Sequence, residues 1–185
     1  MEYNIDEITV ILDDRLKSKA KEMAGYYDEE SRKCGILKTV ENGYNLFFIG
    51  FLGELAMQKY LGLPYKIKRY IDFGHDFDLN GKKVEVKTSK LKSPLKELKE
   101  GYKVFVATNE RIKNSDIISF VRVSPSFVYA YLLGWVESDR LNEFPVVKYG
   151  NMPTPAHTIF LKYLKPVYLL KSDLLKSDCL LDRWM

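Results

Sequence analysis

The dipeptide Asn80-Gly81 constrains the fold of this chain more than any other short feature. It lies between two strand-like runs in the segment DFDLNGKKVEVKTSK, and it is the strongest short-range signal for a two-residue type I′ hairpin turn. In such a hairpin Asp76 faces Glu85 directly across the two strands. Lys87 lies two residues beyond Glu85, so its side chain shares that face of the sheet.

The predicted hairpin brings two carboxylates and one ammonium group together. Facing residues have Cβ atoms about 4.5–5.5 Å apart, and at that distance two bare carboxylates repel, so that one is driven to protonate. A hard divalent cation between Asp76 and Glu85 removes this conflict, and oxygen ligands suit Mg²⁺ or Mn²⁺. Asp, Glu and Lys around such a cation are the groups that metal-assisted phosphodiester hydrolysis requires.

The composition is that of an ordinary folded protein. The 185 residues are 46% hydrophobic and 29% charged, which favours one domain with a substantial core over a disordered chain. Cys34 and Cys179 are the only cysteines, too few for a four-cysteine iron–sulfur site within the chain, and they have no metal-ligand spacing. We expect a reduced intracellular protein, with a single disulfide as the alternative. Because no apolar stretch is long enough to span a membrane and the N-terminus is no signal peptide, we expect a cytoplasmic protein with no membrane partner.

Basic residues are concentrated around the hairpin, although the net charge of the whole chain is only +4. The cluster consists of Lys82, Lys83, Lys87, Lys90, Lys92, Lys96, Lys99 and Lys103. Taken alone, it is equally well explained as a solvated face. Beside a candidate phosphate-cutting site, a track for the DNA backbone is the better interpretation. The candidate DNA contacts are Lys83, Ser89, Lys90 and Lys92.

Two helices are predicted before the hairpin. Residues 5–27 carry apolar side chains at helical spacing, and an extension through residues 29–33 is compatible with the pattern. The second predicted helix covers residues 44–61 and ends at Gly62. It is apolar nearly all round, so we expect it to be buried.

Glu54 is the anomaly in the second predicted helix, because it lies on the same face as Phe51 and Gln58. A carboxylate on a core face is costly unless it is paired or faces a cation. Pairing with a Lys or Arg elsewhere, or capping of a groove, is the structural explanation. The hairpin downstream favours the alternative that Glu54 joins the metal site.

Most of the chain from residue 65 to residue 136 alternates as β-strands do. The predicted strands cover residues 65–70, 74–79, 82–89, 103–108, 116–123 and 127–136. A short helix is predicted after Pro94, and the tail of residues 150–185, which contains three prolines, is predicted to be irregular with a closing helix near residues 172–181. We therefore expect a single domain with N-terminal helices over residues 5–61, a core sheet over about residues 65–136, and this tail. Such an order fits an α/β fold with a mixed central β-sheet flanked by helices.

The spacing Glu-x-Lys carries little information alone, because Glu97 and Lys99 also have it. That second copy lies in a polar, helix-like segment. Glu85 instead lies on an alternating apolar strand, follows a hairpin turn, and has an aspartate at the facing position. We therefore place the candidate site at Glu85.

The helix GFLGELA with its Glu54, then Asp76, then the strand VEVKT of residues 84–88, together resemble the PD-(D/E)XK nuclease superfamily, also called restriction-endonuclease-like. The resemblance extends over roughly residues 48–136 in the order of the elements. The phrase VYAYLLGWV resembles a later core strand of some phage, viral and archaeal members. His75 stands where the family has its proline, and this departure leaves the acidic position of the motif less defined.

The resemblance implies a divalent-metal-dependent DNA endonuclease with a restriction-endonuclease-like fold. It implies that Asp76, Glu85 and the Val86 carbonyl hold Mg²⁺ or Mn²⁺. It further implies that Lys87 orients or deprotonates the attacking water and stabilises negative charge on the phosphate, and that Glu54 binds a metal-bound water or a second ion. A homodimer acting on duplex or branched DNA is also implied, as a restriction-type enzyme or a Holliday-junction resolvase, in the host cytoplasm if the chain is viral.

The residues themselves leave two questions open. Asp78 lies on the same pleat as Asp76 and is its rival as the motif aspartate, although a surface ion pair with Lys83 would explain it. Asp72 is a weaker rival, and His75 is expected to point to the opposite face as a packed or hydrogen-bonded side chain. An extra residue in the turn would shift every facing pair by one. The alternative function is a nuclease-like fold that binds nucleic acid without cutting it.

Overall fold

The computed structural model describes residues 8–35, 43–65, 75–92, 101–108, 114–148 and 154–172. Within these ranges the helices are α1 (Asp14–Lys33) and α2 (Gly43–Leu61). The strands are β1 (Ile8–Ile11), β2 (Phe77–Leu79), β3 (Lys82–Lys90), β4 (Lys103–Ala107), β5 (Ile117–Val123), β6 (Tyr129–Glu137), β7 (Val146–Val147) and β8 (Ala156–Phe160). Short 3-10 helices, η2 (Ser138–Glu143) and η3 (Leu161–Tyr163), follow β6 and β8, and residues 167–172 are helical.

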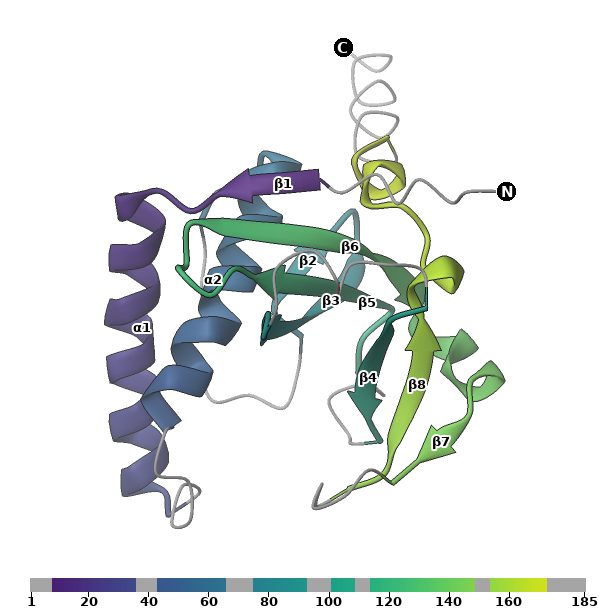
Figure 1. The fold of residues 1–185 in the computed structure, drawn as a ribbon. Coiled ribbons are helices and arrows are strands. Elements are labelled where there is room, and N and C mark those ends of the chain that lie inside the picture. The colour runs from purple at the N-terminus through teal and green to yellow at the C-terminus, as the bar shows by residue number, and fades with distance from the viewer. Residues whose placement is uncertain are drawn as a thin grey trace.

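The strands form two sheets, and the molecule has three layers (Figure 1). The larger sheet has the order β1-β6-β5-β3-β2, with β3 and β5 parallel and the other neighbours antiparallel. The smaller antiparallel sheet has the order β4-β8-β7. The prediction of an α/β fold with a mixed sheet is thus confirmed. Helices α1 and α2 lie on one face of the larger sheet, whereas the smaller sheet lies on the other side (Figure 1).

Each face of the larger sheet has its own hydrophobic core. The core on the side of α1 and α2 includes Leu16, Leu52, Leu55, Val84, Val86 and Val121. The core between the two sheets includes Val104, Val106, Ile118, Phe120 and Ile159. Because side chains alternate along a strand, Glu85 and Lys87 lie on the face of the second core, opposite to α2.

The predicted hairpin turn is confirmed. Asn80 and Gly81 both have positive φ, at 51° and 76°, as the central residues of a type I′ turn require. The register pairs Phe77 with Val84, so the turn contains no extra residue.

Helix α2 agrees closely with its prediction, and its end has a clear cause. Gly62 has a φ of 74°, and its N–H donates to the Lys59 carbonyl while the Leu63 N–H donates to the Gln58 carbonyl. These two bonds form a Schellman motif, which satisfies the last carbonyls of the helix.

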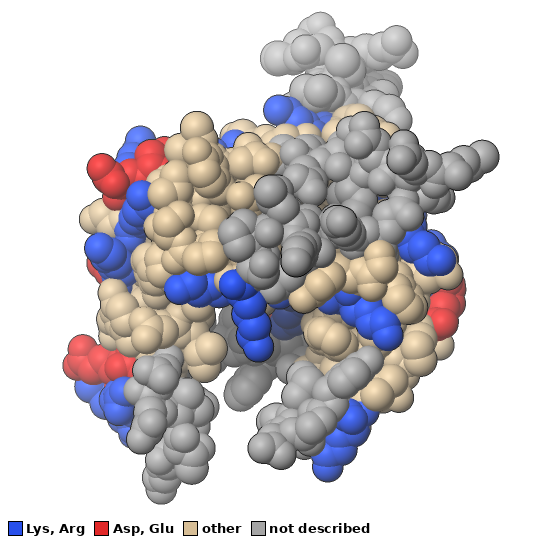
Figure 2. All heavy atoms as spheres, in the orientation of Figure 1, with Lys and Arg blue, Asp and Glu red and all other residues tan. Residues whose placement is uncertain are grey.

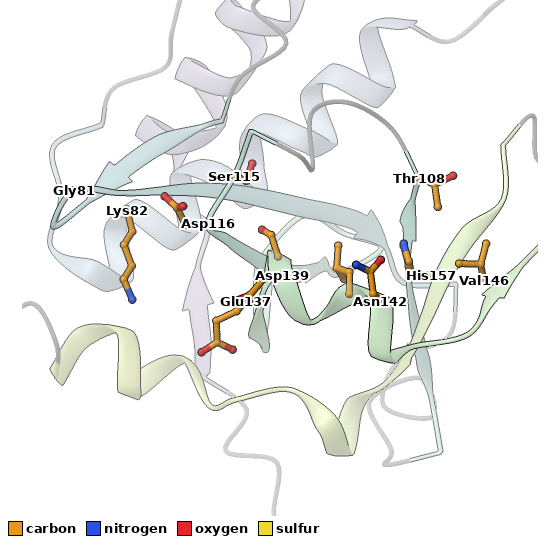
Figure 3. A pocket seen from close by; sticks show the side chains of 12 residues that line it. Gly81, Lys82, Thr108, Ser115, Asp116, Glu137, Asp139, Asn142, Val146 and His157 are labelled. Atoms are coloured by element: carbon orange, nitrogen blue, oxygen red, sulfur yellow. The ribbon is translucent and has the colours of Figure 1, made fainter.

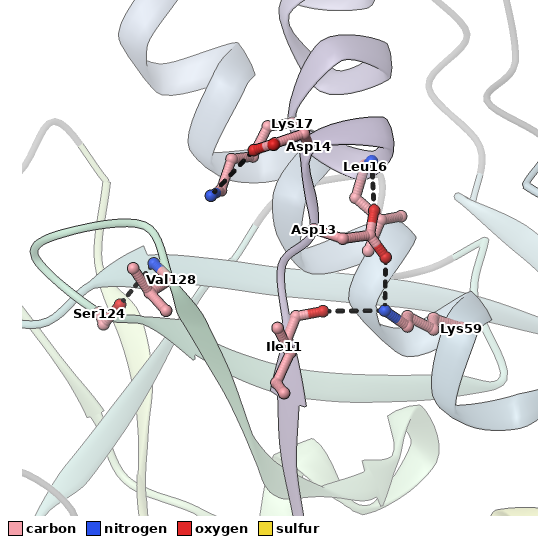
Figure 4. A network of polar contacts seen from close by, with 8 residues as sticks. All are labelled: Ile11, Asp13, Asp14, Leu16, Lys17, Lys59, Ser124 and Val128. Atoms are coloured by element: carbon pink, nitrogen blue, oxygen red, sulfur yellow. Dashed lines mark hydrogen bonds and ion pairs between the residues drawn. The ribbon is translucent and has the colours of Figure 1, made fainter.

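Asp13 anchors the start of α1. Its Oδ1 accepts a hydrogen bond from the Leu16 N–H at 2.9 Å, which is N-capping. Its Oδ2 lies 2.7 Å from Lys59 Nζ, and the same ammonium donates to the Ile11 carbonyl (Figure 4). This network joins β1, α1 and α2 at one corner of the larger sheet.

The helix predicted over residues 5–27 was wrong in its first part. Ile8–Ile11 is the edge strand β1, antiparallel to β6, with Val10 buried and Ile11 exposed. The apolar residues there fit both periods, and pairing with β6 decides in favour of the strand. The extension to Lys33 is confirmed.

Two further expectations about the sheet need correction. The strand predicted at residues 103–108 exists as β4, but it pairs with β8 in the smaller sheet and not within the central one. Strand β8 itself lies in the tail that was predicted to be irregular; with only five residues, it fits between Pro155 and Pro166. Both errors have one cause, because a β4–β8 pair joins segments that are far apart in sequence.

Several predictions concern residues outside the described ranges. They are most of the strand at residues 65–70, Asp72, the helix after Pro94, the second Glu-x-Lys copy at Glu97, and all but the start of the helix at residues 172–181. Among the residues that are described, no helix has the length and apolar character needed to cross a lipid bilayer.

Candidate active site

Asp76 lies directly before β2, where the hairpin ladder stops. Its N–H donates to the Val84 carbonyl at 2.9 Å, and its Oδ2 accepts from the Val86 N–H at 2.6 Å. Asp76 is therefore bonded to the residues on both sides of Glu85. The expected ladder pair of Asp76 with Glu85 is not formed. Val84 pairs with Phe77, and its carbonyl also accepts from the Asp76 N–H, so Asp76 and Phe77 both lie opposite Val84, as in a β-bulge.

Glu85 and Lys87 form an ion pair on β3. Lys87 Nζ lies 2.5 Å from Glu85 Oε1. The Glu85 residue is only 4% exposed, whereas the Lys87 side chain is 26% exposed. A buried carboxylate needs a close opposite charge to offset its desolvation, and Lys87 provides it. The ammonium still reaches solvent, so it can also attract an anion.

Helix α2, which carries Glu54, packs on β3 from the face of the sheet opposite to Glu85. A Cβ placed on Gly53 would lie 1.8 Å from Thr88 Oγ1, so α2 crosses β3 at a point where only glycine fits. Thr88 Oγ1 also faces the Gly50 carbonyl at 3.5 Å. Glu54 follows Gly53 and is half-buried. The contact at Thr88 holds α2 against the strand that carries Glu85 and Lys87.

The carboxylates of Asp76 and Glu85 fit a hard divalent cation in kind, because Mg²⁺ and Mn²⁺ prefer oxygen ligands. Within the described ranges, however, no three His, Cys, Asp or Glu side chains gather into a group that could hold a metal ion. The predicted set of Asp76, Glu85 and Glu54 is thus not assembled as a ready cage. Mg²⁺ is commonly held by only one or two carboxylates, with water and substrate phosphate completing its shell, and the pair of Asp76 and Glu85 suits that mode.

The rival aspartate has a different partner from the one expected. Asp78 faces Lys83 in the register, but its side chain contacts His75, whose Nε2 lies 2.9 Å from Asp78 Oδ1. The expected ion pair with Lys83 was therefore wrong, whereas a hydrogen-bonded role for His75 is confirmed. Asp78 is exposed and is bound to its own segment, which favours Asp76 as the motif aspartate.

A basic cavity of about 380 Å³ adjoins Lys87. The lining includes three of the four predicted DNA contacts, Ser89, Lys90 and Lys92. The fourth, Lys83, does not line it and lies near the hairpin turn at the other end of β3. Figure 2 shows Lys and Arg side chains gathered beside a hollow of the surface between the helical side and the smaller sheet.

Among the lining residues that the sequence did not predict are one cation and two partly exposed aromatic residues, Arg122, Tyr102 and Phe105. Arg122 is the single charged residue in the apolar strand IISFVRV, and this exception could have identified it. Nothing local to Tyr102 or Phe105 indicates the cavity, because β4 reaches it only by pairing with β8.

A larger cavity of about 1040 Å³ lies at the opposite ends of β3 and β5. Figure 3 shows Lys82, Asp116 and Glu137 on one side of it and His157 on the other. Burial raises the pKa of Glu137, but the hydrogen bond from Lys165 and the charge of that ammonium outweigh burial and lower it overall. The lining carries more acidic than basic side chains, so this cavity does not suit a phosphate backbone.

A comparison with models of known protein families finds no match, and a comparison with curated proteins finds none either.

Proposed function

We propose that this chain is a divalent-metal-dependent DNA endonuclease with a restriction-endonuclease-like fold. The observation that carries the proposal is the arrangement on β3. Asp76 is hydrogen-bonded to the backbone on both sides of Glu85. Lys87 forms an ion pair with Glu85 and also lines a basic cavity. Two carboxylates and a lysine beside a basic site are the groups that phosphodiester hydrolysis requires.

The order of the elements supports the same proposal. A buried helix, α2, is followed by the hairpin β2–β3, and β3 then pairs in parallel with β5 inside a mixed sheet. This order agrees with the resemblance to the PD-(D/E)XK superfamily. The close contact of α2 with β3 at Gly53 keeps Glu54 near the strand that carries the motif.

Each site residue has a proposed role. Asp76 and Glu85 would hold Mg²⁺ or Mn²⁺, with the Val86 carbonyl as a further oxygen donor. Glu54 is left out of this ligand set, because α2 packs on the face of the sheet opposite to Glu85. When bound, the cation supplies charge neutralisation at the phosphate. Lys87 contributes its ammonium to the same phosphate, because it lies between Glu85 and the cavity. The basic side chains Lys90 and Lys92 would position the DNA backbone.

The second candidate is a nucleic-acid-binding protein of the same fold that does not cut. One observation favours it. Lys87 already neutralises Glu85 at 2.5 Å, and the described residues include no ready three-ligand metal group. A protein that only binds DNA needs the basic cavity and nothing more.

The test is incubation of the protein with supercoiled, linear duplex, single-stranded and four-way-junction DNA. Each substrate is used with Mg²⁺, with Mn²⁺ and with EDTA. We expect cleavage of at least one substrate with a metal ion and none with EDTA, and a homodimer by light scattering if both strands are cut. Binding without cleavage of any substrate would favour the second candidate.

A further inference from the structure

The basic cavity lies where the carboxyl ends of β3 and β5 meet β4, and residues from both faces of these strands line it. Its lining comes from the ends of β3 and β5 and from the start of β4. Lys87 and Ser89 project from β3 and Arg122 from β5 on the face opposite to α2, since Ser89 pairs with Arg122 in the register. The cavity therefore extends from the candidate catalytic lysine toward β4.

The charge of the cavity is of one sign. Its charged lining residues are Lys87, Lys90, Lys92 and Arg122. None of the described residues that line it is acidic. A polyanion would therefore enter this cavity in preference to the larger one, where Asp116 and Glu137 line the wall.

Two aromatic side chains stand beside these cations. On β4, Val104 and Val106 point into the second core, so Phe105 points the other way and is 40% exposed while lining the cavity. Tyr102 lines the same cavity, and the Arg122 guanidinium lies 5.9 Å from the centre of its ring. Exposed aromatic rings within a basic groove are the usual platform on which unpaired bases stack.

The size of the cavity limits what can occupy it. Its volume of about 380 Å³ is at the low end of the range of small-ligand pockets, about 300–1,000 Å³. One nucleotide fits such a volume, whereas the width of a duplex does not. The bases of a duplex are also stacked on one another and cannot present a face to Phe105.

We infer that this cavity holds one unpaired nucleotide of single-stranded DNA, with the base on Phe105 and its flanking phosphates on Lys92 and Arg122. The inference rests on the proposed function in one respect. If the chain is an endonuclease, the nucleotide site makes an unpaired strand or flap the substrate that reaches Lys87. Phe105 is then a residue that determines specificity for unpaired DNA.

The experiment measures binding by fluorescence anisotropy in EDTA, so that cleavage plays no part. The probes are a labelled oligothymidine of about 12 nucleotides, a duplex of the same length and an oligouridine of the same length. The proteins are the wild type, Phe105→Ala, Phe105→Tyr, and the control Tyr168→Ala, which removes another exposed ring. Because Phe105 is exposed, the alanine variant is expected to fold, and circular dichroism checks this.

We expect the wild type to bind oligothymidine at least about tenfold more tightly than the duplex. Phe105→Ala should weaken oligothymidine binding about tenfold and leave duplex binding within about twofold, since stacking on one ring is worth this much per base. Phe105→Tyr should restore binding, and Tyr168→Ala should change nothing. Equal affinity for duplex and single strand, no effect of Phe105→Ala on oligothymidine, or tighter binding of oligouridine would overturn the inference.

The outcomes separate this inference from the proposed function. Phe105-dependent binding of single strands by a protein that cuts no DNA with Mg²⁺ or Mn²⁺ would refute the endonuclease and leave the nucleotide site standing. Metal-dependent cleavage with single-strand binding unchanged by Phe105→Ala would refute the nucleotide site and leave the endonuclease standing.

Discussion

The Asp76 carboxylate accepts a hydrogen bond from the Val86 backbone N–H, with 2.6 Å between Oδ2 and N. This bond, rather than strand pairing, places Asp76 beside Glu85. Asp76 thus has a structural task and a proposed metal-binding task, and two substitutions can separate them.

Asp76→Asn should abolish cleavage and leave the fold intact, because the amide oxygen can still accept from Val86 while the charge is lost. We expect activity to fall by about 100-fold or more. Asp76→Ala should in addition lose about 1–3 kcal/mol of stability, since the Val86 N–H loses its partner. Urea unfolding measures the difference, with Asp78→Asn as the control for a nearby exposed aspartate. Equal stability of the two Asp76 variants would contradict this assignment.

Gly53→Ala should separate α2 from β3. The new Cβ would lie 1.8 Å from Thr88 Oγ1, so we expect a loss of about 1–3 kcal/mol from overpacking. Thr88→Ala removes the two nearest atoms and should restore part of that stability in the double variant. Gly50→Ala is the matched control in the same helix, because nothing lies within 4 Å of its new Cβ; it should stabilise by up to about 1 kcal/mol. Equal effects of the two glycine substitutions, measured by urea unfolding, would refute the contact.

Asp13 should make stability depend on pH in the acid range. The hydrogen bond from Lys59, with that from the Leu16 N–H, holds the pKa of the Asp13 carboxyl below its ordinary value, which is about 3.9. Its contribution is therefore present above pH 3.9 and is lost as the pH falls below that value through the folded pKa. Asp13→Asn should flatten this part of the curve of urea midpoint against pH, whereas Asp14→Asn should not. An unchanged acid slope in Asp13→Asn would rule the network out.

The sequence predicted correctly those elements that depend on neighbouring residues alone. The type I′ turn follows from Asn80-Gly81, and the end of α2 follows from Gly62, because positive φ at these positions is a property of the residues themselves. The ion pair of Glu85 with Lys87 likewise follows from alternation along one strand.

Long-range pairing set the features that the sequence did not predict. Ile8–Ile11 has the spacing of a helix and becomes β1 only because β6 is beside it. Phe105 looks like an ordinary strand residue until β4 pairs with β8 and places it in the basic cavity. The bulge at Asp76, where the chain enters β2, depends on a hydrogen bond between the Asp76 side chain and the Val86 backbone. The periodicity of the sequence does not indicate such a bond.

The most direct test of the endonuclease is the rate of Mg²⁺-dependent DNA cleavage by Glu85→Gln, compared with the wild type and with Glu143→Gln. Glu143 is an exposed glutamate whose partner is Arg140, so its substitution controls for the loss of one carboxylate. We predict that Glu85→Gln loses about 100-fold or more of the activity while it still binds oligothymidine in EDTA, and that Glu143→Gln cuts like the wild type. Cleavage by Glu85→Gln at the wild-type rate would contradict the account.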